Sequence, residues 1–213
     1  MILIPTIPQP NHEELRYSLR LIEIHHPEQE VAICGYLPEW LTNVNYLPFN
    51  DSPNYQFKAR NIYNKIVHTF EQTGVDNLLF FNDDHFIFAP VDYYHHKGKM
   101  TTEGRAPNGT YTALLRNTIE KFPNCNDFDT HCPIWYNADK FEALTQLDWN
   151  KPHGYGIKTS YCEMNGIKGE YYEDLKFRDK VGDFSNRLYF STSDETDLTI
   201  LKQTITNKSK FEK

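Results

Sequence analysis

Strand-like and helix-like segments alternate along the first ninety residues, and this alternation restricts the fold more than any other feature. Apolar runs of strand length are separated by segments whose apolar residues recur at helical spacing. Strands that are joined through helices favour a mainly parallel sheet with helices packed on it. We therefore predict an α/β fold. The expected strands are residues 1–7, 30–35, 44–48 and 78–81, and the expected helices are 11–26 and 55–73.

Length and composition narrow the class of protein. A chain of 213 residues fits one domain, and no low-complexity linker divides it. The net charge of -7 argues against a protein that coats nucleic acid. No apolar run has the length of a membrane span, and the start lacks the pattern of a signal peptide. Four cysteines without paired spacing do not favour a zinc site or disulfides, so a cytoplasmic, reducing location is expected.

An acidic step interrupts the apolar stretch from Leu78 to Phe88. The run Leu78-Leu79-Phe80-Phe81 reads as a buried strand, and Asn82-Asp83-Asp84 follows at its carboxyl end. Ligands of open α/β sheets bind at that end of the strands. Two carboxylates and an amide there suit Mg²⁺ or Mn²⁺, which would hold phosphate oxygens. The alternative is a plain strand-to-turn transition, because Asn and Asp also form turns.

Two groups of basic residues are candidates for binding phosphate. Lys58 and Arg60, with Asn61, lie near the start of the second helix, where helix amides also attract anions. Arg16 and Arg20 share one face of the first helix at four-residue spacing. Either group is also compatible with a solvated cationic face, and Arg16 and Arg20 with surface ion pairs.

At this point the sequence resembles nucleotide-sugar glycosyltransferases of the GT-A fold. In that family an Ala-Arg-Asn segment on a helix precedes a strand that ends in an Asp-x-Asp motif, and Ala59-Arg60-Asn61 and Asn82-Asp83-Asp84 stand in those places. Since Asn replaces the first acid, the resemblance implies Asp84 as the main metal ligand and Asp83 as the second. It also implies a late histidine as a further ligand, for which His153 is a candidate.

A more local resemblance is to Stealth-type sugar-phosphate transferases of capsule synthesis. It rests on Asn11 to Arg20, on Pro38-Glu39-Trp40-Leu41, on the acidic step and on a later His-x-Pro, His131-Cys132-Pro133. The Trp-Val-Asp-Gly opening of that family is absent, and the chain is short for it. The resemblance covers residues 11–90 well and the remainder in patches.

The resemblance also bears on catalysis. It implies that His131 contacts metal or substrate, or acts as a general base, a role for which imidazole is suited near neutral pH. Glu163 and Asp174 are further candidates for the base if the reaction inverts the anomeric carbon, although spacing distinguishes neither.

These features together predict a glycosyltransferase that depends on Mn²⁺ or Mg²⁺ and moves a sugar from a nucleotide-sugar donor to a hydroxyl, for example of a glycan. Residues 1–90 would bind the nucleotide, 91–213 would face the acceptor, and the loop 101–110 would close over the donor. Three alternatives stay open: a hexose-1-phosphoryl transferase on the same fold, a non-catalytic nucleotide-binding module, and an enzyme that glycosylates modified nucleic-acid bases.

Overall fold

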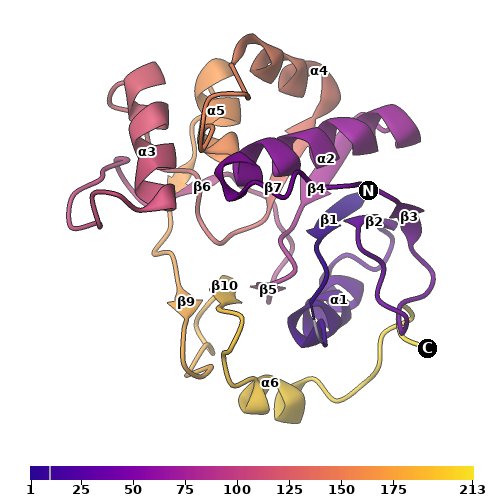
Figure 1. Cartoon of the computed structure of the whole chain (residues 1–213). Coiled ribbons are helices and arrows are strands. Elements are labelled where there is room, and N and C mark those ends of the chain that lie inside the picture. The colour runs from indigo at the N-terminus through magenta and orange to yellow at the C-terminus, as the bar shows by residue number, and fades with distance from the viewer. Residues whose placement is uncertain (10) are drawn as a thin grey trace.

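A five-stranded sheet with strand order β3-β2-β1-β4-β7 forms the centre of the computed structural model, which describes residues 1–9 and 11–213 (Figure 1). Its first four strands are parallel and only β7 is antiparallel, which confirms the predicted mainly parallel sheet. The strands are β1 (Ile2–Thr6), β2 (Val31–Gly35), β3 (Asn45–Leu47), β4 (Asn77–Phe80) and β7 (Ile134–Asn137).

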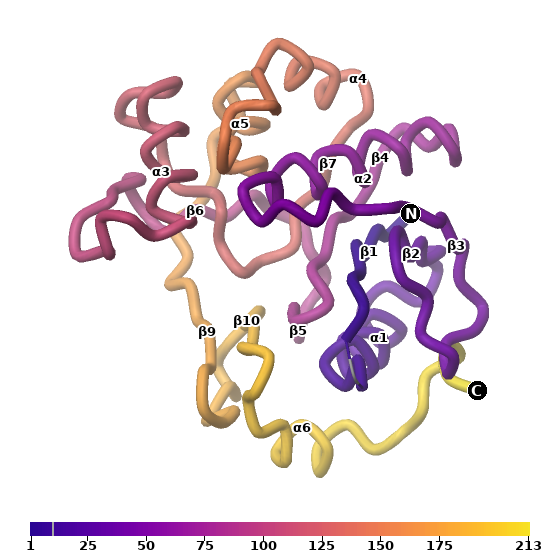
Figure 2. The backbone as a smooth tube through the Cα atoms, in the orientation of Figure 1, coloured from indigo at the N-terminus to yellow at the C-terminus, as the bar shows by residue number. Residues whose placement is uncertain are grey.

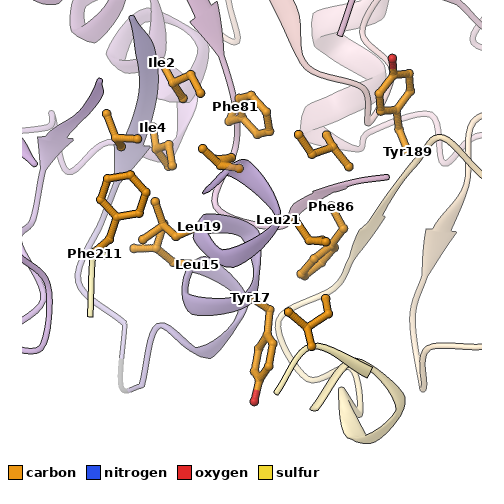
Figure 3. Close-up of a cluster of buried hydrophobic side chains, with 14 of the residues drawn as sticks. Ile2, Ile4, Leu15, Tyr17, Leu19, Leu21, Phe81, Phe86, Tyr189 and Phe211 are labelled. Atoms are coloured by element: carbon orange, nitrogen blue, oxygen red, sulfur yellow. The ribbon is translucent and has the colours of Figure 1, made fainter. Parts of the chain in front are cut away.

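Helices cover both faces of this sheet because successive strand residues point to opposite sides. Ile2 and Ile4 pack into one buried cluster with Leu19, whereas Leu3, between them, packs into a second cluster with Ile66 (Figure 3 shows the first cluster). Both faces are therefore apolar, as expected for a parallel sheet between two layers of helix. The helices of this half are α1 (Glu13–His25) on the first face and α2 (Lys58–Thr73), entered through the 3₁₀ turn η1 (Tyr55–Phe57), on the second.

Short elements outside the central sheet follow β4 in the chain. They form a three-stranded sheet of order β5-β10-β9 and a two-stranded sheet of β6 and β8. The sequence indicates a late strand over residues 187–191, which is β10, but not these two sheets. Among the described residues, no helix is long and apolar enough to cross a membrane. The strands are β5 (His85–Ile87), β6 (His95–His96), β8 (Glu170–Tyr171), β9 (Lys176–Phe177) and β10 (Tyr189–Thr192). The helices are α3 (Thr110–Lys121), α4 (Ala138–Phe141), η2 (Glu142–Gln146), α5 (Ile157–Met164) and α6 (Thr199–Thr204).

The final residues return to the first half of the molecule, as the yellow end of the tube in Figure 2 shows. Glu212 pairs with Leu41 in an isolated bridge. Its buried carboxylate accepts hydrogen bonds from Arg20 Nε at 2.7 Å and from Arg16 at 2.8 Å. Although burial raises the pKa of Glu212, these bonds and one from the Ser209 amide outweigh it and lower the pKa to about 2.

Arg16 and Arg20, which the sequence suggested as phosphate ligands, both pair with this carboxylate. Arg20 uses Nε and a terminal nitrogen on Glu212 and donates the other to the carbonyl of Ile205. The guanidinium of Arg20 is thus occupied by a carboxylate and a carbonyl of the same chain.

Candidate active site

A cavity of about 840 Å³ opens where β4 ends and α2 and α5 begin. The parallel strands bring their carboxyl ends to this edge, and α2 starts there because it runs antiparallel to them. Lys58 from α2 and Asn82, just after β4, both line the cavity, as do His131 and Asp174. Its other charged lining residues are Lys97, Arg105, Lys158, Lys176, Arg178, Asp129 and Glu173.

His131 and Asp174, two residues that the sequence raised separately, meet in this cavity. Asp174 Oδ2 lies 2.8 Å from His131 Nδ1, and Asp174 Oδ1 accepts the backbone N–H of His131, also at 2.8 Å. Burial raises the pKa of Asp174, but the bonds and charge of His131 and the nearby Lys97 outweigh it, so the pKa falls to about 2. Because ionised Asp174 only accepts, Nδ1 of a neutral His131 carries the proton, and Nε2 keeps its lone pair.

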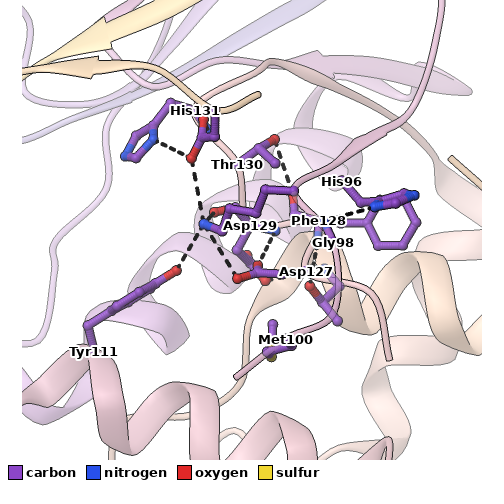
Figure 4. A network of polar contacts seen from close by, with 12 residues as sticks. His96, Gly98, Met100, Tyr111, Asp127, Phe128, Asp129, Thr130 and His131 are labelled. Carbon is purple, nitrogen blue, oxygen red and sulfur yellow. Dashed lines mark hydrogen bonds and ion pairs between the residues drawn. The ribbon is translucent and has the colours of Figure 1, made fainter. Parts of the chain in front are cut away.

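Two lysines, the half-buried Lys97 and the buried Lys158, hold this pair in place. Lys97 lies 3.6 Å from Asp174 Oδ2 and 3.5 Å from Asp127 Oδ2, and it donates to the backbone carbonyl of Asp129. Figure 4 shows the polar network around Asp127, Asp129 and His131. Lys158 donates to the carbonyls of Thr130 and Cys132, the residues on either side of His131, at 2.7 and 2.6 Å. The backbone and the ring of His131 are therefore both fixed, as a pre-organised general base requires.

The start of α5 requires a glycine. Asp129 accepts weak hydrogen bonds from the first amides of α5, those of Lys158 and Thr159, both at 3.4 Å. A Cβ at Gly156 would lie 2.0 Å from Asp129 Oδ2, so any other residue would displace the carboxylate. Gly156 thereby lets Asp129 reach the start of α5, the helix whose Lys158 contacts the backbone on either side of His131.

The acidic step after β4 lies beside the cavity. The backbone N–H of Asn82 donates to His85 Nδ1 at 3.2 Å, and its side-chain amide lies 3.3 Å from His85 Nε2. Burial, reinforced by the charge of Asp84, raises the pKa of Asp83 to about 7. Asp84 Oδ2 accepts a 2.9 Å hydrogen bond from Lys176, whereas its buried Oδ1 has no partner among the described residues.

These donors match the expected divalent ion incompletely. Asp83 and the free Oδ1 of Asp84 offer two oxygens, but an ammonium group already lies against the same carboxylate. Within the described residues, no three His, Cys, Asp or Glu side chains are grouped so that they could hold a metal. His153, the expected third ligand, instead packs its ring near Tyr55 and donates its backbone N–H to Gln56. The residues as folded do not fit a metal centre.

Three other residues, predicted to bind the donor or to act as the base, have partners outside the cavity lining. Arg60 stacks on Phe57 and donates to Asn150, and Asn61 forms two hydrogen bonds with Ser52. Glu163 is exposed and accepts from the backbone of Asn126. Of the basic residues expected near the start of α2, only Lys58 lines the cavity.

Sequence reasoning missed most of the cavity's cations. These cations lie in irregular or short elements, where no periodic pattern marks a functional side chain. They are Lys97, Arg105, Lys158, Lys176 and Arg178. For four of the five, the available signal was the density of lysine and arginine between residues 97 and 105 and between 176 and 180; Lys158 lies in neither stretch. Such runs are as typical of a solvated surface.

Comparison with solved structures identifies the fold. No protein-family model matches the sequence, and no curated protein matches it. An active-site mutant of LgtC aligns over 99% of this chain and 98% of its own, with a TM-score of 0.50 at 10% identity. LgtC described as a galactosyltransferase with donor and acceptor sugar analogues gives 0.49 at 11% identity, with the same two coverages. A glycosyltransferase involved in glycosylating the major capsid of PBCV-1 gives 0.43 at 13% identity, over 96% and 97%. The alignment with a TM-score of 0.50, together with the mainly parallel sheet between helices, shows the GT-A fold.

Proposed function

We propose that this protein is a glycosyltransferase that moves a sugar from a nucleotide-sugar donor to an acceptor hydroxyl, with His131 as the general base. The observation that carries the proposal is the hydrogen-bonded pair of His131 and Asp174 in a cavity at the carboxyl edge of a GT-A sheet. A base, a residue that orients it and room for a substrate are the parts that such a reaction needs.

In this mechanism Nε2 of His131 accepts the proton of the acceptor hydroxyl while the hydroxyl oxygen attacks the anomeric carbon. The bond from that carbon to the diphosphate oxygen breaks, and the nucleoside diphosphate leaves with the electron pair. Asp174 stabilises the imidazolium that forms and keeps the ring oriented. Lys58 and Asn82 lie at the sheet edge where the donor's diphosphate is expected.

The divalent ion expected at Asp83 and Asp84 has no step in this mechanism. Lys176 already pairs with Asp84, and a third ligand is missing among the described residues. The chemistry assigned to His131 and Asp174 requires no metal.

The test is to incubate the purified protein with a panel of nucleotide sugars, without and with candidate glycan and nucleic-acid acceptors, and to follow the products by mass spectrometry. We expect one donor to lose its nucleoside diphosphate, and His131→Ala to slow this release at least about 100-fold. Added imidazole should restore part of the rate in that variant. A matched His68→Ala variant, which changes a histidine on α2 outside the cavity lining, should keep the wild-type rate.

The products separate the competing functions. Release of nucleoside monophosphate with a phosphate-linked product would mean sugar-phosphate transfer and would overturn the proposal. Nucleotide binding without turnover, for any acceptor, would mean a binding module. Turnover only with a nucleic-acid acceptor would keep the chemistry and change the substrate.

A further inference from the structure

The position of Lys176 is determined by the small sheet and not by a flexible side chain alone. Lys176 on β9 pairs with Ser191 on β10, and Ser191 pairs with His85 on β5. The lysine thus lies two strands from the residue that directly follows Asp84. Its ammonium contacts Asp84 Oδ2 at 2.9 Å, and the two side chains are 24% and 16% exposed. A largely buried ion pair therefore stands where a divalent ion was expected.

Lys176 also lines the cavity, so its ammonium contacts Asp84 on one side and the cavity on the other. An ammonium has three N–H donors, and Asp84 uses one of them. The others remain for an anion in the cavity. In this position the lysine can link a carboxylate to a phosphate, which is the task that a divalent ion performs between the same groups.

Three further cations line the cavity without a countercharge. Lys58 begins α2, Arg105 precedes α3, and Arg178 follows β9. Across residues 1–9 and 11–213, the side chains of these three residues form no ion pair or hydrogen bond; Arg105 only lies over the ring of Tyr111. We call Lys58, Arg105 and Arg178 the unpaired cations.

The cavity as a whole is basic in an acidic protein. Its lining contains six lysines and arginines but only three acids, although the chain has a net charge of -7. A donor's diphosphate carries about two negative charges, and the unpaired cations come from three separate elements that surround one space. The charge of the site therefore complements a diphosphate without a bound metal.

We propose that the unpaired cations hold the diphosphate of the donor and that Lys176 takes the place of a divalent ion at Asp84, so that nucleotide binding needs no metal. This inference rests on the proposed function. It departs from the metal dependence that the resemblance to nucleotide-sugar glycosyltransferases implied.

The first test measures binding of UDP, GDP, ADP and CDP by calorimetry at fixed ionic strength, with protein treated with EDTA and with added Mn²⁺ or Mg²⁺. We expect one diphosphate to bind with dissociation constants that agree within about twofold in all three conditions. Lys58→Gln, Arg105→Gln and Arg178→Gln should each weaken binding about tenfold. Arg116→Gln, which removes an exposed arginine on α3 outside the cavity lining, should leave binding unchanged.

The second test addresses Lys176. Lys176→Met should weaken binding in EDTA about tenfold, whereas Lys176→Arg keeps the charge and should bind like the wild type. Circular dichroism of both variants checks that the fold is retained; if Lys176→Met unfolds, the wild-type comparison with and without Mn²⁺ still decides.

Failure of this inference differs from failure of the proposed function. Binding that is lost in EDTA and restored by Mn²⁺ would overturn the inference and leave glycosyl transfer intact. Tight binding by Lys176→Met in EDTA would also overturn it. Absence of binding to every nucleotide in every condition would overturn both.

Discussion

Replacing Asp174 with Asn tests the central feature of the site, because His131 presents two donors to this carboxylate. Asp174 accepts the ring Nδ1–H and the backbone N–H, both at 2.8 Å. Asn offers one oxygen and one NH₂ group, so one of the two contacts must change. If the NH₂ group faces the ring, Nδ1 becomes the acceptor and the proton moves to Nε2, where a base needs a lone pair. We expect kcat to fall between about 100-fold and 10,000-fold with KM little changed.

The same substitution has a cost in stability that the structure allows us to estimate. The pKa of Asp174 falls from 3.8 to about 2, and its side chain is 11% exposed, so its ionised form contributes about 2 kcal/mol to folding. Urea unfolding at pH 7 should show a loss of this size for Asp174→Asn.

Kinetics of the nucleotide sugar that the wild type turns over separate the two effects. Assays at urea concentrations well below the unfolding midpoint, where the variant is folded, should still show the loss in kcat. The matched variant Asp139→Asn, which changes an exposed carboxylate on α4, should match the wild type in both measurements. An Asp174→Asn variant that is folded and retains more than about a tenth of wild-type kcat would refute the assignment of His131 as a base oriented by Asp174.

Three further predictions concern Glu212, Gly156 and Glu163. Because the pKa of Glu212 is lowered from 4.5 to about 2, Glu212→Gln should lower the free energy of unfolding by about 3 kcal/mol at pH 7. The wild type should lose this contribution as the pH falls from 4.5 towards 2. Equal unfolding curves of the two proteins at pH 7 would contradict the prediction. Gly156→Ala should cost about 2 kcal/mol and lower turnover, because the new Cβ displaces Asp129, and a thermal melt together with the transfer assay measures both. Glu163→Gln should leave turnover unchanged, because this exposed acid lies outside the cavity lining; a fall in kcat would restore it as the base.

The sequence predicted the fold through signals that are local. The apolar runs became β1, β2 and β4, and the apolar spacing of the two long helices placed them on the sheet, because burial on both faces requires these patterns. The sequence did not predict the sheet of β5, β9 and β10. Its strands are only two to four residues long, and β5 pairs with β10 across about a hundred residues of chain.

The candidate site was predicted only in parts for the same reason. His131 and Asp174 were each candidates, but their hydrogen bond joins positions 43 residues apart, which no spacing rule indicates. The partners of Asp84 and Arg20 lie 92 and 192 residues further along the chain. Since the sequence did not reveal Lys176 as the partner of Asp84, this carboxylate was interpreted as a metal ligand. Since it did not reveal Glu212 as the partner of Arg20, this arginine was interpreted as a phosphate ligand.

The pairing of Arg20 with Glu212 also has a consequence for the order in which the chain folds. Helix α1 and its sheet partners lie within the first eighty residues, so they can collapse early, but Arg20 then lacks its countercharge. A guanidinium that is desolvated without a partner destabilises such an intermediate. We expect the helix to dock firmly only after the residues around Glu212 arrive. Contacts of such high sequence separation slow folding, so the residues around Glu212 should control how long a partly folded chain stays sensitive to proteases.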